Sequence, residues 1–319
     1  MKHRRLRILT WHVHGNYLWY LTQAPHDFFL ATDAARSMHH GGASGILPWG
    51  PNVHEVPVER IAAERFDAVL YQSRHEWDGD RHRYLSEAQR RGPALYLEHD
   101  PPQEHPVDQR HWVAAEGEPN VLLVHCTPFN ALMWDAGRSP VRVIEHGIQL
   151  LQPAHYSGHV ARGVVVVNNL GVRGRRLGLD VYRAAAERVP LALYGMASHE
   201  VGGDGEVPND RLPGTMAAHR FFFNPIRWTS LGLAVLEAMM VGVPVVGLAT
   251  TELASVIRDG ENGFVDTRLD RLVDCMQRLL DDPQLARELG TAGQRTARER
   301  FGIERFAADW SDAFASVTG

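Results

Sequence analysis

One carboxylate stands out in the most apolar helix that the sequence predicts. Glu237 lies in the run 231–241, which ends at Gly242 and precedes a buried strand at 243–246. The apolar residues of this run recur at helical spacing at Leu233, Leu236, Met240 and Val241. An ionised carboxylate in these surroundings needs a partner. An arginine or a backbone donor would satisfy Glu237 without a ligand, whereas the hydroxyl groups of a ligand are the functional alternative.

The start of the same helix complements that carboxylate. Thr229 or Ser230 can cap the helix, which we expect to begin near Leu231. The free N–H groups and the positive dipole end at the helix start suit a phosphate. The residues that would contribute there are Ser230, Leu231, Gly232 and Leu233. A phosphate at the helix start and a ribose diol on Glu237 would together describe a nucleotide site.

A cluster of arginines offers a second anion-binding feature. Arg173, Arg175 and Arg176 alternate with glycines between a buried strand at 163–169 and the helix that follows. Guanidinium groups on a glycine-rich turn form a plausible cradle for phosphates. A solvated basic turn is the alternative, and the sequence does not distinguish which arginine would bind.

The first half of the chain has polar residues where its strands end. His99 lies between Glu98 and Asp100 at the end of the strand 94–98, and Gly15 and Asn16 follow the strand 6–13. Ligands of open α/β sheets bind at the carboxyl ends of strands. His99 could therefore contact a ligand, or it could brace its own turn by bonding Glu98 or Asp100. The turn at Gly15 could equally be a plain tight turn.

The elements that must position these residues form two α/β halves. The length of 319 residues favours about two domains. Strands are predicted at 66–72 and 120–126 in the first half and at 191–196 and 221–223 in the second, with a linker at 149–162. The segment 31–52 is predicted to be a loop, and 81–91 a helix. Three helices are predicted at the end of the chain, at 268–280, 283–300 and 303–317.

The central run resembles the donor-binding segment of the retaining glycosyltransferases of family 4, which have the GT-B fold. That family usually shows Glu, seven residues, Glu and then Ala-Met, followed by Gly-x-Pro-Val-Val. Glu237-Ala238-Met239 and Gly242-Val243-Pro244-Val245-Val246 match this pattern. The first Glu is replaced, because position 237 − 8 = 229 is Thr229.

The resemblance implies an α/β fold of the GT-B type, with two Rossmann-like domains facing across a cleft. Residues 1–150 would be the acceptor domain, 151–302 the nucleotide-sugar donor domain, and 303–319 a helix that packs back on the first domain. His99 and Thr229 would lie at the transferred sugar. The donor would be bound by Gly15, Asn16, Arg173, Arg175, Arg176, Ser230, Leu231, Gly232, Leu233, Glu237 and Glu252.

The implied reaction moves a sugar from a UDP- or GDP-linked donor to an acceptor hydroxyl with retention. The acceptor, which could be a sugar, a lipid-linked sugar or a small molecule, is not identified. Clamps of helix N–H groups and arginines would make a bound metal unnecessary, so we expect neither a metal nor a cofactor. Two alternatives stay open: a nucleotide-sugar epimerase of the same fold, and a non-catalytic protein that binds sugar nucleotides. The replacement at Thr229 is the best support for the second.

Composition narrows the partners and the compartment. A net charge of −5 argues against nucleic acid as the main partner. Cys126 and Cys275 lie in apolar contexts, which favours buried free thiols. The sequence shows neither a signal peptide nor a run of ~18 apolar residues that would span a bilayer. We therefore expect a cytoplasmic protein, and contact with a membrane surface is compatible with this composition.

Overall fold

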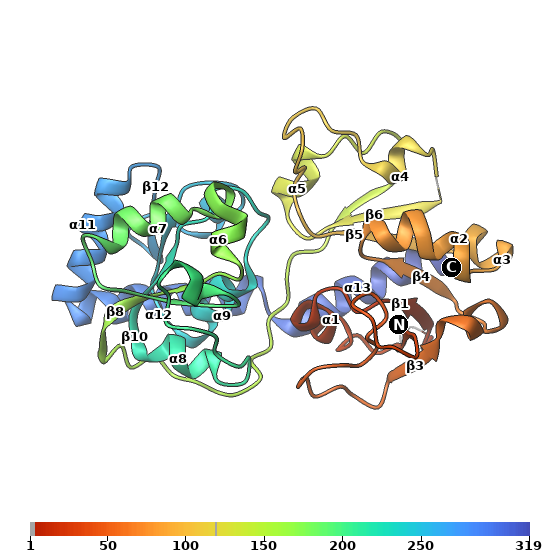
Figure 1. The fold of residues 1–319 in the computed structure, drawn as a ribbon, viewed down its shortest axis with the longest axis horizontal. Coiled ribbons are helices and arrows are strands. Elements are labelled where there is room, and N and C mark those ends of the chain that lie inside the picture. Colours follow the sequence, from red (N-terminus) through yellow and green to blue (C-terminus); the bar gives the residue numbers. More distant parts are fainter. Residues whose placement is uncertain (1–3, 119) are drawn as a thin grey trace. The chain divides into compact units, whose positions relative to one another are not determined.

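The computed structural model describes residues 4–118 and 120–319 (Figure 1). The chain divides into two compact units. The first unit comprises the chain up to Gly147 together with Ile303–Gly319, and the second comprises Ile148–Gly302.

Unit 1 is built on a parallel sheet of seven strands in the order β3-β2-β1-β4-β5-β6-β7. The order reverses between β1 and β4, so the loops after these two strands diverge at a topological switch point. The central strands are buried on both faces, which explains why they read as short continuous apolar runs. The strands are β1 (Arg7–Thr10), β2 (Asp27–Thr32), β3 (Val53–Pro57), β4 (Ala68–Tyr71), β5 (Ala94–Glu98), β6 (Val121–His125) and β7 (Val141–Val143).

Helices cover both faces of the first sheet. The last helix, α13 (Ile303–Thr318), packs against α1 (Gly15–Leu21) and against β4 and β5. On the other face, Trp11 after β1, Tyr71 of β4 and Tyr96 of β5 pack with Trp77 in one apolar cluster. The remaining helical segments are η1 (Val58–Ala63), the π-helix η2 (Glu76–Asp80), α2 (Arg81–Tyr84), α3 (Glu87–Arg91), α4 (Trp112–Ala115) and α5 (Pro128–Met133).

Unit 2 is built on a parallel sheet of five strands in the order β12-β11-β10-β8-β9. Its switch point lies between β8 and β10, the strands that precede the arginine turn and the Glu237 helix. The strands are β8 (Val160–Val166), β9 (Leu191–Tyr194), β10 (His219–Asn224), β11 (Val245–Leu248) and β12 (Gly263–Asp266).

The second sheet is also covered on both faces. Phe221 and Phe223 pack in a cluster with α7 (Leu179–Ala186) and α11 (Leu269–Asp281). On the other face α9 (Leu233–Val241) packs against α8 (Leu212–Ala218), α12 (Pro283–Arg300), β10 and β11. The short segments are α6 (Leu170–Arg173), η3 (Gly174–Leu177), η4 (Ser198–Val201) and α10 (Leu253–Val256).

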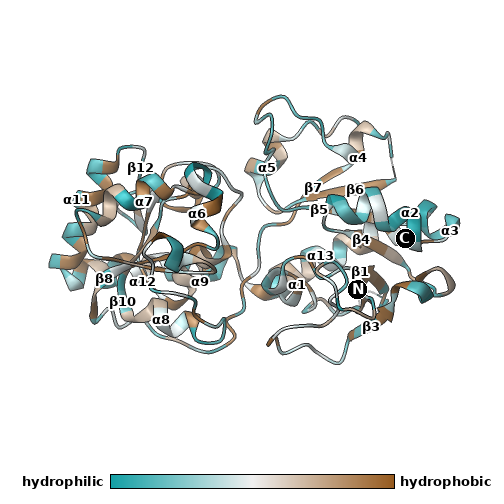
Figure 2. Ribbon diagram, in the orientation of Figure 1, coloured by the Kyte–Doolittle hydropathy of each residue, from teal (hydrophilic) through white to brown (hydrophobic). Residues whose placement is uncertain are grey.

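Hydropathy follows this layering. In Figure 2 the hydrophobic colour is concentrated on the inner strands β4, β5 and β6, whereas α2 and α3 are largely hydrophilic. Cys126 and Cys275 are buried free thiols, as predicted. Within residues 4–118 and 120–319, no helix combines the length and the apolar character needed to cross a membrane.

Several predicted elements need correction. The expected helix at 81–91 is two short helices, because Ser86 starts a new one with a capping box that pairs its side chain with Gln89. The strand expected at 6–13 ends at Thr10, so His12 and His14 belong to the following loop. The strands β2 and β3 were not predicted, and they border the loop expected at 31–52.

Candidate functional site

The predicted site residues of unit 2 gather at the switch point of the second sheet. The arginine turn follows β8, the loop 225–232 follows β10, and the turn 249–252 follows β11. The carboxyl ends of neighbouring parallel strands lie at one edge of a sheet, so these three segments are neighbours. Hydrogen bonds join each of the two outer segments to the loop in the middle.

The backbone of Arg176 ties the first two segments together. Its carbonyl oxygen accepts hydrogen bonds from the backbone N–H groups of Arg227 and Trp228, at 3.1 and 3.2 Å. Gly178 lies at the same junction with φ +82°, and a Cβ atom there would lie 2.0 Å from the carbonyl oxygen of Pro225. Only glycine permits this approach, so the two loops form one rigid surface.

The three candidate arginines differ in their surroundings. Arg175 pairs with Asp180 at 2.6 Å, and Arg227 grips the same carboxylate with both terminal nitrogens at 2.5 and 2.8 Å. These pairs hold the pKa of Asp180 below its usual value, with the Arg227 hydrogen bonds as the largest cause. Arg173 is exposed on α6. Arg176 is half-buried, and its side chain has no acidic partner among the described residues.

The helix that carries Glu237 starts later than predicted. Gly232 is the N-cap of α9 and no side chain caps the helix, so the expectation that Thr229 or Ser230 caps it is wrong. Thr229 instead lies half-buried in the loop, and Ser230 and Leu231 are buried. The first turn, which begins at Leu233, contains no acidic residue. The Val235 N–H donates to the carbonyl oxygen of Gly232 at 3.1 Å, and the positive end of the helix dipole at this turn suits an anion.

Glu237 opens the second turn of α9 and is buried, with 6 % of its surface exposed. The helix around it is apolar, as the spacing predicted. A nucleotide site with its phosphate at the helix start and its ribose on Glu237 requires a buried carboxylate one turn behind an uncapped helix start, as found here. Its role toward a ligand stays a prediction.

The turn after β11 completes this edge. The hydroxyls of Thr250 and Thr251 donate to the carbonyl oxygens of Ile226 and Ser230, at 3.0 and 3.4 Å. Thr251 has φ +50°, an unfavourable conformation for a β-branched residue. Glu252, and neither of these threonines, is the N-cap of α10.

Glu252 is fixed by side chains. It is buried, it pairs with Arg300 at 3.1 Å, and it accepts a hydrogen bond from the Ser255 hydroxyl. These contacts account for its carboxylate without any ligand.

The predicted residues of unit 1 gather at the switch point of the first sheet. Gly15 and Asn16 open α1 after the short loop that follows β1, and His99 follows β5, the neighbour of β4. The His99 ring lies edge-to-face against His14 at 4.4 Å and Tyr17 at 4.9 Å between ring centroids. Burial, followed by the nearby His14 and His146, lowers the pKa of His99 well below 6.5. His99 is therefore neutral near pH 7.

The His99 ring makes no hydrogen bond to Glu98 or Asp100 among the described residues, although the backbone of His99 is hydrogen-bonded to the Glu98 carboxyl group. Its Nε2 atom lies 3.4 Å from Oε1 of Gln72, at the end of β4. Glu98 is held instead by His111, 3.2 Å from its carboxyl group, and by the backbone N–H of Asp100. Burial raises the pKa of Glu98 to about 8 and lowers that of His111 to about 3. Sequence reasoning missed Gln72 and His111, and only the end of a strand at Gln72 offered a signal.

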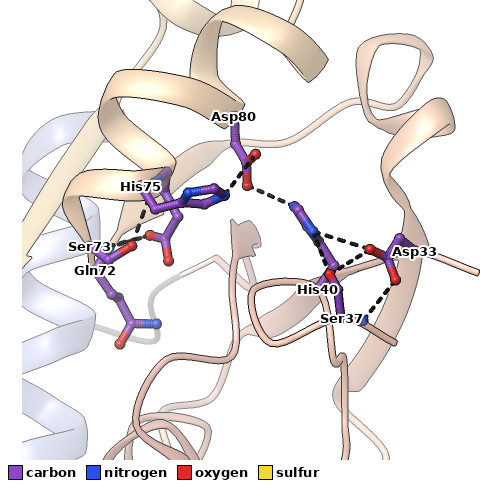
Figure 3. Close-up of polar contacts among 8 residues, drawn as sticks. Asp33, Ser37, His40, Gln72, Ser73, His75 and Asp80 are labelled. Atoms are coloured by element: carbon purple, nitrogen blue, oxygen red, sulfur yellow. Dashed lines mark hydrogen bonds and ion pairs between the residues drawn. The ribbon is translucent and has the colours of Figure 1, made fainter. Parts of the chain in front are cut away.

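A third polar cluster in unit 1 was also missed. Asp80 lies between His40 and His75, with its oxygens 2.8 and 3.6 Å from their Nε2 atoms (Figure 3). Ser37 and Asp33 contact the other side of the His40 ring (Figure 3). These contacts fasten the loop 33–52, which spans the gap from β2 to β3, to the π-helix η2.

Asp80 also belongs to an Asp-x-Asp triplet, Asp78-Gly79-Asp80, a pattern of carboxylates that can bind a metal ion. The expectation of a metal-free site did not take this triplet into account. Asp78 pairs with Arg74 at 2.9 Å. Within the described ranges, no group of three or more His, Cys, Asp or Glu side chains is placed to hold a metal ion.

The chain is similar to known glycosyltransferases. Residues 179–282 match the family described as glycosyl transferases group 1. A trehalose synthase of Pyrococcus horikoshii is 26% identical over 169 residues, which cover 44% of this chain and 40% of the relative. An O-antigen chain mannosyltransferase B of Escherichia coli is 36% identical over 115 residues, covering 34% of this chain and 29% of the relative. The chain thus matches less than half the length of these curated relatives.

Solved structures match nearly the whole chain. Sucrose-phosphate synthase from Thermosynechococcus elongatus superposes with a TM-score of 0.72 at 18% identity, covering 98% of this chain and 99% of that one. Anabaena HepE in complex with UDP and glucose gives a TM-score of 0.72 at 15% identity, covering 98% and 100%. These neighbours are glycosyltransferases of the GT-B type. The chain therefore has the predicted GT-B fold, and its second unit contains a region similar to the group 1 glycosyl transferases.

Proposed function

We propose that this protein transfers a sugar from a nucleoside diphosphate sugar to an acceptor hydroxyl. The observation that carries the proposal is the edge of the second sheet. An uncapped helix start and a buried carboxylate one turn behind it lie there, and backbone hydrogen bonds join the arginine turn to the loop before that helix. The region that matches group 1 glycosyl transferases, 179–282, includes α9 and the loop before it.

The parts of this edge suit the parts of such a donor. The N–H groups at the start of α9 and the guanidinium of Arg176 would bind the diphosphate and stabilise it as it leaves. The Glu237 carboxylate would accept hydrogen bonds from a ribose diol. UDP is bound by the HepE structure that this chain resembles, so UDP is the first nucleotide to test.

The first experiment is a thermal-shift panel with UDP, GDP, ADP and their sugars. A ligand that binds only the folded state raises the melting temperature, so the correct donor identifies itself. Glu237→Ala and Arg176→Ala should each abolish most of the shift. Unchanged binding of every nucleotide in both variants would sink the proposal.

The reaction itself is tested with the donor that binds. We propose transfer with retention, as in the family that the central run resembles. We also propose that no metal is bound, because helix N–H groups and arginines can stabilise the diphosphate. NMR of the anomeric proton in the product reports the stereochemistry, and activity that survives a chelator reports metal independence. An inverted product would contradict retention. Complete loss of activity with the chelator would contradict metal independence.

Thr229→Glu examines the position where the family pattern is broken. Lost turnover would indicate that Thr229 is adapted to its own donor. Gained turnover would indicate a degenerate site and would favour a protein whose main role is to bind sugar nucleotides.

A further inference from the structure

We propose that Gln72 is a positioning residue that holds His99 in the tautomer protonated on Nε2, so that Nδ1 accepts a hydrogen bond from a sugar hydroxyl. The hydrogen bonds decide that Nε2 carries a proton, and the neutral state of the ring then leaves the lone pair on Nδ1. The ligand class rests on the proposed function.

The orientation of the Gln72 amide is set by its donors. Gln72 Nε2 lies 2.9 Å from the carbonyl oxygen of Trp11 and 2.9 Å from Oγ1 of Thr10. A carbonyl oxygen only accepts, so the atom facing Trp11 must be the amide nitrogen. The Thr10 hydroxyl donates its own proton to the carbonyl oxygen of Leu70 at 2.9 Å, which leaves its lone pairs for Gln72. Both N–H groups of the amide are therefore used.

This orientation turns the amide oxygen toward His99. Oε1 of Gln72 lies 3.4 Å from Nε2 of His99, and an amide oxygen can only accept. The ring nitrogen must therefore carry the proton, since the other tautomer would set two lone pairs against each other. His99 is neutral, as its lowered pKa indicates, so Nδ1 then holds a lone pair.

Both residues are held at the backbone as well. The Glu76 carboxyl group accepts from the backbone N–H groups of Gln72 and Ser73, at 2.6 and 3.2 Å. The carbonyl oxygen of His99 accepts from Asn130 Nδ2 at 3.1 Å and from the Cys126 thiol at 3.2 Å. Gln72 and Thr10 are buried, with 4 % and 0 % of their surfaces exposed. Buried groups of the sheet therefore hold both Gln72 and His99 in the positions that these hydrogen bonds require.

The consequence concerns what His99 can recognise. Among the described residues, Nδ1 of His99 has no hydrogen-bond partner, whereas Nε2 is engaged by Gln72. A neutral ring in this tautomer presents an acceptor and cannot donate from Nδ1. The hydroxyl groups of a sugar are donors that fit it.

The direct test is NMR of the protein labelled with ¹⁵N-histidine, with the His99 signals assigned from a His99→Gln variant. Near pH 7 we expect the full-length protein to show a neutral His99 with its proton on Nε2. In Gln72→Met, which removes the amide but keeps the chain length, both tautomers should be populated. A proton on Nδ1 in the unmodified protein, or an unchanged tautomer in Gln72→Met, would overturn the proposal.

The kinetic test separates positioning from a loss of stability. Gln72→Met should lower kcat/KM for the nucleotide sugar by roughly 10- to 100-fold, as for other residues that orient a histidine, and leave the affinity for the nucleoside diphosphate unchanged. Gln89→Met is the matched control. It removes an amide of the same unit that donates to two carbonyl oxygens, those of Ile61 and Glu64, and that does not contact His99.

The two tests fail separately. If no sugar nucleotide binds, the proposed function fails, and the NMR result still decides the tautomer. If transfer occurs but Gln72→Met and Gln89→Met reduce kcat/KM equally, the positioning role is wrong.

Discussion

The two units place their candidate binding groups at the same topological position. The groups are uncharged in unit 1 and positively charged in unit 2. At the β1/β4 edge of unit 1 the groups are His99, whose pKa is lowered, and the amide of Gln72. At the β8/β10 edge of unit 2 they are a helix start without acidic residues and a turn with three arginines. A switch point therefore provides a binding position, and the residues that follow its strands decide which chemical groups of a ligand can bind there.

The difference has a physical basis in burial. Histidines that are enclosed by aromatic rings lose their charge, because burial disfavours the protonated form. Arginine keeps its charge in any protein environment, and a helix start adds partial positive charge without any titratable group. Uncharged donors and acceptors suit hydroxyl groups, whereas fixed positive charge suits phosphates.

The largest effect should come from breaking the joint at the second edge. Gly178→Ala would force Cβ against the carbonyl oxygen of Pro225 at 2.0 Å and should destabilise unit 2 by about 3 kcal/mol or more. Calorimetric unfolding measures this. Gly202→Ala is the matched control, because Gly202 has the same left-handed conformation (φ +80°, ψ 22°) but no atom within 4 Å, and it should cost about 1 kcal/mol. Equal effects would show that the two loops are not rigidly joined.

The next effect concerns which arginine binds. Arg176→Ala should weaken binding of a nucleoside diphosphate by roughly 10- to 100-fold, as expected for loss of a charged hydrogen bond. Arg175→Ala should have a smaller effect, because Arg175 is engaged by Asp180. Isothermal titration calorimetry compares the two. A larger loss with Arg175→Ala would reverse the assignment.

Acid should destabilise unit 1 through His125, the last residue of β6. The ring nitrogens of buried His125 have no partner within the described part of the chain, and burial lowers its pKa from 6.5 to about 4. Between these values the unfolded chain binds more protons than the folded one, so this histidine destabilises the fold as the pH falls below 6.5. The stability advantage of His125→Leu should grow by about 2 kcal/mol between about pH 7.5 and pH 5.

Urea unfolding followed by tryptophan fluorescence checks that value, because the tryptophans other than Trp228 lie in unit 1. The comparison of wild type and variant cancels the opposing titration of buried Glu76 and Glu98. A difference that is independent of pH would contradict the lowered pKa of His125.

The smallest effect concerns strain at the second edge. Thr251→Gly removes the cost of a β-branched residue at φ +50° and should stabilise unit 2 by about 0.5–1 kcal/mol. Thr250→Gly, at a neighbouring residue without positive φ, should destabilise it. Calorimetry of both variants is the measurement. If Thr251→Gly is also destabilising, the Thr251–Ser230 contact outweighs the strain.

Local patterns allowed much of this to be predicted. The apolar spacing around Glu237 predicted its helix, and the strand before the arginine turn was predicted because buried strands read as short apolar runs. The start of α9 was misplaced, because capping depends on the path of the loop, and that loop is held by contacts to residues far away in the chain. Gln72 could not be predicted, because its partners come from β1 and from the turn after β5.

The sequence by itself determined the two α/β halves, the helix of Glu237 and the arginine turn, because periodicity, glycines and strand ends are local properties. Only the tertiary structure decided that Asp180 engages Arg175 and not Arg176, and that Arg300 holds Glu252. The same holds for the tautomer of His99. Each of these depends on which side chains meet after distant segments of the chain pack together. Such hydrogen-bond partners cannot be predicted from the residues next to them in the sequence.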